Sequence, residues 1–255
     1  MTIQFYKYQG TGNDFIIIDN RDLFFPKKKE LITRICNRKF GIGSDGLILL
    51  ENHPELDFEM VFYNPDASQS FCGNGSRCVI AYAKELGLIE NTANFFAIDG
   101  NHSAEIIGEN VRIKMNDVSQ IEENPNHYFL NTGSPHYVTF VDDVHSVNVV
   151  EEARKIRYNE RFKVEGTNVN FVQQQNGYVE ARTYERGVEN ETLSCGTGMT
   201  AVALCAATEG LTGDFCEVKT QGGSTIVYFN KMGRDFTNIW LEGPTALVFK
   251  GEFNV

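Results

Sequence analysis

The sequence has little positive charge, and this shortage narrows the classes of protein that it can encode. Its 255 residues include 34 acidic and 23 basic side chains, which gives a formal net charge of -11 at pH 7. Proteins that hold nucleic acids or anionic membranes without specific contacts depend on clustered Lys and Arg. We therefore expect no nucleic-acid partner and no membrane partner, and local groups must hold any anionic ligand.

Paired cysteines and long apolar runs are also scarce. The six cysteines, at positions 36, 72, 78, 195, 205 and 216, include no CxxC pair, and the chain far exceeds the size of disulfide-stapled miniproteins, so we expect mostly reduced thiols. The least polar run, GMTAVALCAATEG, is shorter than the roughly 20 apolar residues that cross a bilayer. The opening MTIQFYKYQGTGNDF lacks the basic and apolar segments of a secretory signal, which predicts a cytoplasmic protein.

One stretch of the sequence occurs twice. Residues 72–88, CGNGSRCVIAYAKELGL, match residues 195–211, CGTGMTAVALCAATEGL, at 7 of 17 positions, where average composition gives about one match by chance. TGNDFIIID from Thr11 and TGSPHYVTFVD from Thr132 are also similar, at nearly the same offset. A repeat of this length indicates two homologous halves.

We place the boundary between the halves in the turn-rich segment EENPNH, which gives halves at 1–121 and 122–244. The final strand, 245–255, either completes the second half or crosses back to the first. Within each half, apolar residues at helical spacing indicate one central helix, ended by Gly87 in the first half and by Gly210 in the second. Short β-branched runs such as FIIID, LILL and EMVFY indicate strands. Each half is therefore predicted to be an α+β unit, a curved sheet wrapped around its helix.

Each copy of the repeat places a cysteine, Cys72 or Cys195, at the predicted N-terminus of a central helix. The backbone N–H groups and partial positive charge there favour a thiolate, and the glycines that follow leave those N–H groups open to a carboxylate or phosphate. Two such groups on opposite sides of one ligand can act as acid and base and so invert a stereocentre. A single CGxG is more typical of a buried cysteine in a tight turn, and the repetition argues against that reading.

Removing the hydrogen α to a carboxylate creates a carbanion, which many enzymes stabilise with pyridoxal phosphate. The sequence has no specific signature for that cofactor, so donors at the helix N-termini must stabilise the charge. It also has no CxxC spacing and no HExxH helix, and we predict no metal site. GIGSDG at 41–46 fits the GxGxxG pattern of dinucleotide-binding turns, but a predicted helix precedes it and a predicted strand follows, which is the wrong order.

Five longer motifs resemble one family, the diaminopimelate epimerases. They are GTGNDF at 10–15, YNPDASQSFCGNGSR at 63–77, SPHYV at 134–138, NVNFV at 168–172 and YERGVENETLSCGTG at 184–198. The resemblance covers nearly the whole chain. It implies a fold of two pseudo-symmetric halves, each a curved mixed sheet around a central helix, and a homodimer. It also implies a cofactor-independent isomerase that interconverts LL- and meso-diaminopimelate for lysine and peptidoglycan synthesis.

The same resemblance implies a set of site residues. Cys72 and Cys195 would be the catalytic pair, with Cys72 as donor and Cys195 as acceptor for the LL substrate. Substrate-binding residues would be Asn13, Asn64, Gly73, Asn74, Asn168, Glu185, Arg186, Gly196 and Thr197. Of these, Gly73, Asn74, Gly196 and Thr197 would hold the reacting carboxylate, and Arg186 would be the bidentate partner of the distal one. Glu185 would also tune the thiols, together with His136.

Several alternatives stay open. Ser134 stands where the family often has asparagine, and Gly46 where some members have glutamine, so another two-cysteine racemase, acting for example on histidine, would fit the same fold. A non-catalytic binder of a zwitterionic amino acid is a third class, although it gives no reason for a thiol at both helix entrances. Glu185 and Arg186 could form an ordinary surface ion pair, and His136 could be a hydrogen-bonded structural residue.

Overall fold

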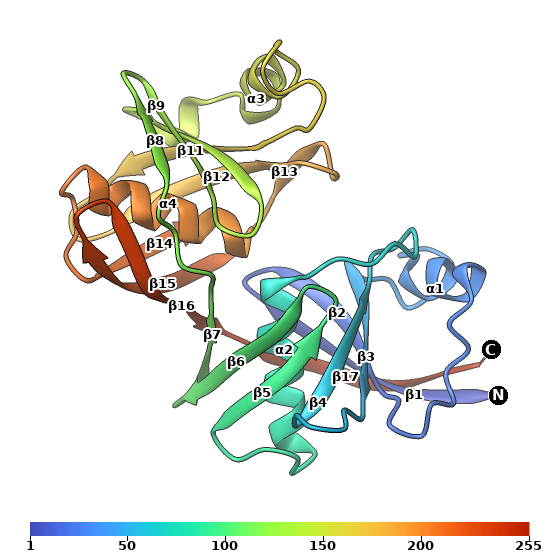
Figure 1. The fold of residues 1–255 in the computed structure, drawn as a ribbon. Coiled ribbons are helices and arrows are strands. Elements are labelled where there is room, and N and C mark those ends of the chain that lie inside the picture. Colours follow the sequence, from blue (N-terminus) through green and yellow to red (C-terminus); the bar gives the residue numbers. More distant parts are fainter. Residues whose placement is uncertain (255) are drawn as a thin grey trace. The chain divides into compact units, whose positions relative to one another are not determined.

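The chain folds into two compact units in a computed structural model that describes residues 1–254 (Figure 1). The first unit comprises Met1–Ile113 together with the residues from Gly243 onward, and the second comprises Lys114–Glu242. Each unit combines a mixed sheet with two α-helices. The predicted fold class, α+β with two pseudo-symmetric halves, is confirmed.

The sheet of the first unit begins with the last strand of the chain. Its order is β17 (Ala246–Asn254), β1 (Thr2–Gly10), β2 (Asn13–Asp19), β3 (Gly46–Glu51), β4 (Phe58–Tyr63), β5 (Thr92–Ala97), β6 (Gly100–Ile107) and β7 (Asn110–Lys114). The β2–β3 and β4–β5 pairs are parallel, and the other neighbours are antiparallel. Because a parallel pair needs a crossover, α1 (Lys29–Cys36) connects the first of these pairs and α2 (Gly73–Glu85) connects the second.

The second unit repeats this topology. Its order is β8 (Ile121–Asn124), β9 (His127–Asn131), β10 (Pro135–Phe140), β11 (Asn168–Gln174), β12 (Val179–Glu185), β14 (Phe215–Thr220), β15 (Gly223–Met232) and β16 (Asp235–Pro244), with β13 (Asn190–Thr192) paired to β12. The parallel pairs are β10–β11 and β12–β14. They are connected by α3 (Val149–Arg157) and by α4 (Gly196–Thr208). The internal repeat read from the sequence is therefore also a repeat of strand order and direction.

The two central helices, α2 and α4, form where apolar spacing predicted them. Residues 198–207 of α4 are buried throughout, as expected for a helix that is apolar on every side. It packs against strands from β9 to β15, and α2 packs against β1, β2, β3, β4 and β6 (Figure 1). Both helices end before a glycine with positive φ, +71° at Gly87 and +75° at Gly210, the left-handed conformation that favours glycine after a helix. The predicted helix ends are confirmed.

The boundary between the units differs from the prediction. Residues 114–120 belong to the second unit because Met115 donates a backbone hydrogen bond to Ile239 and Val118 exchanges two with Phe236. The segment EENPNH is not a linker. It is the turn of the β8–β9 hairpin, where Pro125 and Asn126 reverse the chain. The final strand, β17, belongs to the first unit, where it pairs with β1.

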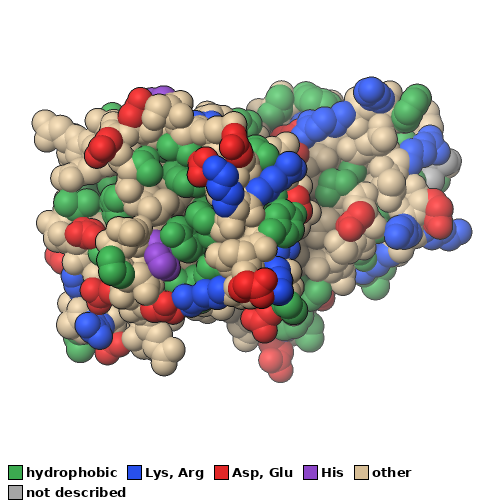
Figure 2. Space-filling view, turned by 90° about the horizontal axis from the view of Figure 1, so that it is seen from above, with side chains coloured by type: hydrophobic (Ala, Val, Ile, Leu, Met, Phe, Trp, Pro, Cys, Tyr) green, Lys and Arg blue, Asp and Glu red, His purple; other side chains and the backbone are tan. Residues whose placement is uncertain are grey.

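Charged side chains of both signs lie on the surface (Figure 2). On the face drawn in Figure 2, acidic and basic side chains are interspersed, and no continuous basic stripe is visible. No helix within residues 1–254 is both long enough and apolar enough to span a bilayer. The GIGSDG segment follows α1 and ends where β3 begins at Gly46, so the helix–turn–strand order expected from the sequence is confirmed.

Candidate active site

Cys72 is the N-cap residue of α2. Its backbone is extended, with φ −135° and ψ 109°, and its sulfur accepts a hydrogen bond from the backbone N–H of Gly75 over 3.4 Å. Polar side chains are the usual acceptors at this position, because the first N–H groups of a helix have no partner within the helix. The thiol therefore lies at the positively charged end of the helix dipole.

A cluster of polar side chains surrounds Cys72. The Asn13 Oδ1 atom lies 3.9 Å from the Cys72 sulfur and 3.4 Å from Asn74 Nδ2. The Asn13 amide donates to Asp45 over 2.6 Å, which fixes its orientation. Asn74 is buried, and its Oδ1 lies 3.5 Å from the hydroxyl of Thr11. Three of the predicted residues, Cys72, Asn13 and Asn74, are therefore brought together within the first unit.

Behind this cluster lies Arg77, a fully buried cation. One guanidinium nitrogen donates to the Thr11 hydroxyl over 3.1 Å. The other two, Nε and Nη1, have no hydrogen-bond partner among the described residues. Burial lowers the pKa of Arg77, and the nearby Cys78 and Cys72 sulfurs oppose that shift. An unneutralised buried guanidinium is costly for the fold, so its presence beside the thiol suggests a functional reason.

A network of charged side chains contacts Asn13 through Asp45. Asp14 forms ion pairs with Lys7 and with Arg38, each over 2.6 Å, and Arg38 also pairs with Asp45. Burial alone would raise the pKa of Asp14, but the hydrogen bonds from Arg38 and Lys7 outweigh it and lower the pKa to about 2. Asp45 is therefore held in place from two sides, and it holds the amide of Asn13.

Asn64 lies outside this cluster. It follows β4, and its side-chain amide donates to Ser68 and Ser70 within the loop that leads to Cys72. Gly73 is the first residue of α2. A Cβ built on Gly73 would meet the Ile113 side chain at 3.4 Å, an ordinary contact.

Cys195 occupies the same position in the second unit. It is the N-cap residue of α4, with φ −130° and ψ 112°, and is 8% exposed. Its sulfur lies 3.5 Å from the hydroxyl of Thr197, and that hydroxyl lies 2.9 Å from Nε2 of His136. The backbone N–H groups at the start of α4 begin at Gly196. The predicted residues Cys195, Gly196, Thr197 and His136 thus lie together.

His136, the second residue of β10, is completely buried. Burial lowers its pKa to about 3, and the positive charge of Arg186 acts in the same direction. The imidazole is therefore neutral at pH 7. Its Nδ1 atom lies 3.1 Å from Nδ2 of Asn170, a residue on the neighbouring strand β11.

Asn168 lies on β11, the same strand as Asn170. Its side chain forms hydrogen bonds with residues next to His136 and with the backbone of Arg186. Its amide donates to the Ser134 hydroxyl over 2.8 Å and to the Pro135 carbonyl over 3.1 Å. Its Oδ1 accepts the backbone N–H of Arg186 over 2.8 Å. Asn168 is 2% exposed, so its contacts position Ser134 and the start of the loop that carries Arg186.

Glu185 is the last residue of strand β12, and Arg186 follows it. The guanidinium of Arg186 donates to the Glu165 carbonyl over 2.9 Å, and the Glu185 carboxylate accepts from the Thr192 hydroxyl over 3.0 Å. Gly166 makes the position of Arg186 possible. It has φ +77°, and a Cβ there would approach the Arg186 side chain to 2.7 Å.

Three residues close to the thiols were not predicted from the sequence: Thr11 and Arg77 in the first unit, and Asn170 in the second. Asn170 could have been found, because it is two residues after Asn168 and side chains at that spacing share one face of a strand. Arg77 gave no such signal. An arginine in a helix is ordinarily a solvated residue, and its burial depends on a turn 66 residues away.

The remaining cysteines are all buried. Burial raises the pKa of Cys78 and Cys205 far above the ordinary thiol value, and raises that of Cys216 to about 12. These thiols are expected to be inert packing residues. Among residues 1–254, no group of three or more His, Cys, Asp and Glu side chains is arranged to hold a metal ion.

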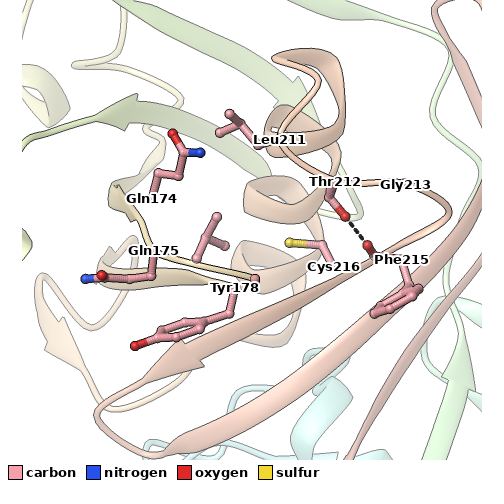
Figure 3. Close-up of a pocket in the computed structure, with 10 residues that line it drawn as sticks. Gln174, Gln175, Tyr178, Leu211, Thr212, Gly213, Phe215 and Cys216 are labelled. Carbon is pink, nitrogen blue, oxygen red and sulfur yellow. Dashed lines mark hydrogen bonds between the residues drawn. The ribbon is translucent and has the colours of Figure 1, made fainter.

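A cavity of about 190 Å³ in the second unit is separate from the thiols (Figure 3). Gln174, Gln175, Tyr178, Leu211 and Cys216 line it, among others, and Thr212 donates to the Phe215 carbonyl at its side. Leu211 and Cys216 follow the C-terminus of α4, whereas Cys195 precedes its N-terminus, and 13 helical residues span about 20 Å. This cavity therefore does not belong to the candidate site.

Comparison with solved structures shows that other proteins share this fold. A phenazine biosynthesis protein of the PhzF family from Bacillus anthracis has the same fold, with a TM-score of 0.78, 16% identity and coverage of 100% of both chains. A hydroxyproline epimerase from Agrobacterium vitis, with a TM-score of 0.66 and 16% identity, shares it over 98% of this chain and 92% of its own. At this level of identity these likenesses show the fold that the chain shares with them.

Sequence comparison then identifies the family. The profile of the family described as diaminopimelate epimerase matches residues 5–121 and 128–246. A diaminopimelate epimerase from Flavobacterium psychrophilum is 50% identical over 254 residues, covering 97% of this chain and 99% of that relative. The chain belongs to the diaminopimelate epimerase family, and it is an isomerase.

Proposed function

We propose that this chain interconverts LL- and meso-diaminopimelate with two thiols, one from each unit. The names of the related proteins support the substrate. The observation that carries the mechanism is the cysteine at the N-cap of each central helix, at equivalent points of a repeated fold. In the LL direction, the Cys195 thiolate removes the α-hydrogen as a proton, and the Cys72 thiol then donates its proton to the opposite face of the α-carbon. The roles reverse in the meso direction.

In this mechanism the two helix entrances must both reach the reacting carboxylate. The first backbone N–H groups of α2, at Gly73 and Asn74, and of α4, at Gly196 and Thr197, would donate to its oxygens. Charge builds on those oxygens as the proton leaves, and fixed donors stabilise it without reorganisation. No added pyridoxal phosphate is required, because the donors take over the role of that cofactor.

The other predicted residues would bind the ends of the substrate. Arg186 would hold the distal carboxylate in a bidentate geometry, and Asn13, Asn64, Asn168 and Glu185 would contact the amino and carboxylate groups. His136 and Glu185 would tune the thiols. The product would serve lysine and peptidoglycan synthesis. Since both thiols must stay reduced, the reducing environment of the cytoplasm suits the reaction.

A homodimer is the proposed assembly, and strand β17 supports it. Leu247, Val248 and Phe249 are 39, 56 and 46% exposed, so this strand carries exposed apolar side chains. Contiguous exposed apolar side chains are typical of interfaces. Light scattering on the purified protein should give the mass of two chains, and Val248→Asp should shift it toward one; a monomeric parent protein would refute the proposal.

The chemistry is tested by hydrogen exchange at the α-carbon. In D2O, with LL-diaminopimelate and no added pyridoxal phosphate, the substrate should gain deuterium as meso-diaminopimelate forms. Strict dependence on pyridoxal phosphate would contradict the two-thiol mechanism. The same assay with histidine, glutamate and proline separates the alternatives: faster turnover of one of these would assign another racemase, and binding without exchange would assign a binder.

The thiols are tested one at a time. Cys72→Ala and Cys195→Ala should each lower kcat by about 10²–10⁴-fold or more, the usual contribution of a positioned acid or base. Cys205→Ala, which removes a buried thiol from the same helix as Cys195, is the matched control and should retain activity. Near-normal turnover of Cys72→Ala or Cys195→Ala, with circular dichroism unchanged, would return that cysteine to a structural role.

A further inference from the structure

Asn170 and His136 form a buried polar pair that the proposed mechanism does not by itself require. Both side chains are fully buried, and Asn170 lies on β11 beside His136 on β10. Buried polar side chains are retained only where hydrogen bonds satisfy them. The directions of these hydrogen bonds determine the protonation of the imidazole.

The orientation of the Asn170 amide is fixed by its two other partners. Its Nδ2 lies 3.0 Å from the Tyr137 carbonyl, which can only accept, and its Oδ1 lies 2.9 Å from the Thr183 hydroxyl. A flipped amide would place its oxygen against the Tyr137 carbonyl. Nδ2 therefore also faces Nδ1 of His136, 3.1 Å away, and donates its second proton to it.

The Asn168 amide does not compete for the imidazole. Its Nδ2 lies 3.4 Å from Nε2 of His136, but closer acceptors, Ser134 Oγ and the Pro135 carbonyl, take both of its protons. Its orientation is fixed in turn, because the Arg186 backbone N–H can only donate to its Oδ1. Nε2 of His136 is thus left to interact with Thr197 at 2.9 Å.

The protons can now be followed from Asn170 to the sulfur. A neutral imidazole whose Nδ1 accepts a hydrogen bond must carry its proton on Nε2. That N–H donates to the Thr197 hydroxyl, which then has its single proton left for its remaining neighbour, the Cys195 sulfur at 3.5 Å. A hydrogen bond donated to a thiolate favours the charged form.

We propose that Asn170 is a positioning residue that fixes the Nε2–H tautomer of His136 and thereby directs the Thr197 hydroxyl proton toward the Cys195 sulfur. In the opposite tautomer, Nε2 would accept that proton and the sulfur would lose this hydrogen bond from Thr197. The functional consequence rests on the proposed role of Cys195 as a base, but the hydrogen-bond chain itself does not. Arg186 is the charged group that faces the imidazole, and it disfavours a cationic ring.

The tautomer is tested directly by NMR of the full chain with ¹⁵N-labelled histidine. The chain has five histidines, and the signal missing from His136→Phe identifies the one of interest. At pH 7 the parent protein should show Nε2–H, and Asn170→Asp, whose carboxylate accepts instead of donating, should show Nδ1–H. An Nδ1–H tautomer or a doubly protonated ring in the parent protein would overturn the proposal.

The effect on the sulfur is tested without substrate, in a Cys72→Ala background. The pH dependence of Cys195 alkylation by iodoacetamide, read by peptide mass spectrometry, reports its thiolate. Thr197→Val and Asn170→Asp should each shift the midpoint upward by about one pH unit, the size expected for one hydrogen bond to a charged group. Thr208→Val, which removes a hydroxyl from the far end of α4, should not shift it.

Two outcomes discriminate further. A shift in Thr197→Val but not in Asn170→Asp would overturn the role of Asn170. If the carboxylate of Asn170→Asp prevents folding, Asn170→Leu removes the donor with little change in volume, and the single tautomer should be lost; a retained Nε2–H signal would count against the proposal. If the tautomer and the alkylation midpoints are as expected but diaminopimelate shows no isotope exchange, the proposed function is refuted and this inference is not.

Discussion

At equivalent points of the repeated topology, the first unit has Phe15 where the second unit has His136. Phe15 opens the parallel pair β2–β3 opposite Gly46, and His136 opens the parallel pair β10–β11 opposite Asn168. Both side chains are fully buried. The same place in the fold therefore accepts an apolar ring in one copy and an imidazole in the other, so packing alone does not require a histidine.

Two residues further along the partner strand, on the same face, the two units show the same contrast between an apolar and a polar side chain. Ile48 and Asn170 each lie beside the glycine three residues after the thiol, Gly75 in the first unit and Gly198 in the second. The first thiol is thus backed by apolar side chains from its sheet and by a buried cation, Arg77, from its helix. The second is backed by a neutral polar pair. One scaffold has thus placed the two thiols in different electrostatic surroundings, with a buried cation near one and a neutral polar pair near the other.

The largest difference between the two halves is expected in the activity of two variants, Gly198→Ala and Gly75→Ala, which add a methyl group at equivalent glycines. A Cβ at Gly198 would lie 2.8 Å from Asn170 Oδ1 and 3.3 Å from His136 Cε1, so Gly198→Ala must displace the polar pair. We expect kcat/KM to fall by about 10²-fold, as for an ångström-scale misplacement.

At Gly75 the nearest atoms are the ends of two flexible side chains, Ile48 at 3.2 Å and Met60 at 3.3 Å. Gly75→Ala should therefore keep most of the activity and gain up to about 1 kcal/mol of helix propensity. Steady-state kinetics and urea unfolding of the two variants test this. Equal losses of activity would show that the surroundings of the two thiols are equally rigid, and the contrast would fail.

A smaller effect on activity is expected from replacing the buried cation, Arg77. The equivalent residue in the second unit is Thr200, which is uncharged. Arg77→Met keeps the volume and removes a charge for which residues 1–254 show no counter-ion, so the free energy of unfolding should rise by about 1–4 kcal/mol. Activity should fall, because the guanidinium supports the hydroxyl of Thr11 beside Asn74. A destabilised Arg77→Met would mean that the guanidinium contributes to the fold.

The smallest of these effects is a difference between the two units in how their stability changes as the pH falls. The folded pKa of His136, about 3, lies below its ordinary value of about 6.5. The unfolded chain therefore binds the proton more readily, and stability is lost as pH falls from 6.5 toward 3, by about 2 kcal/mol at pH 5. Asp14 in the first unit has its pKa lowered to about 2, so its contribution is still complete at pH 5.

Hydrogen exchange corrected for intrinsic rates tests this difference. Between pH 7 and pH 5, protection should fall in β10 and β11 and hold in β1 and β2. The variant His136→Phe, which carries the residue of the first unit, should remove the difference. An unchanged pH response in that variant would assign the acid sensitivity to another group.

The repeat, the two central helices and both thiol positions could be predicted from the sequence, because each depends on local signals. Apolar spacing and a terminal glycine indicate a helix, and the similarity of CGTG to CGNG identifies the equivalent helix in the second half. The surroundings of the thiols could not be predicted in the same way. Whether Arg77 is buried beside Thr11, or Asn170 faces His136, depends on contacts between distant strands that no local pattern encodes.

The boundary between the units was misplaced for a related reason. Pro125 and Asn126 are a strong turn signal, but a hairpin and a linker use the same residues. What separates them is pairing, and the strands on each side of this turn pair with one another. The residues that do cross between the units, near Ile113 and Gly243, lie within strands β7 and β16.

The pairing of β17 with β1 has a consequence for synthesis on the ribosome. Thr2 pairs with Asn254, so the sheet of the first unit needs residues from both ends of the chain. The second unit, in contrast, is one continuous stretch inserted within the first. Domains fold as they emerge, and here the later segment is complete before the earlier one. The nascent chain must therefore keep its N-terminal sheet unfinished, with the β1 edge open, until β17 has been synthesised.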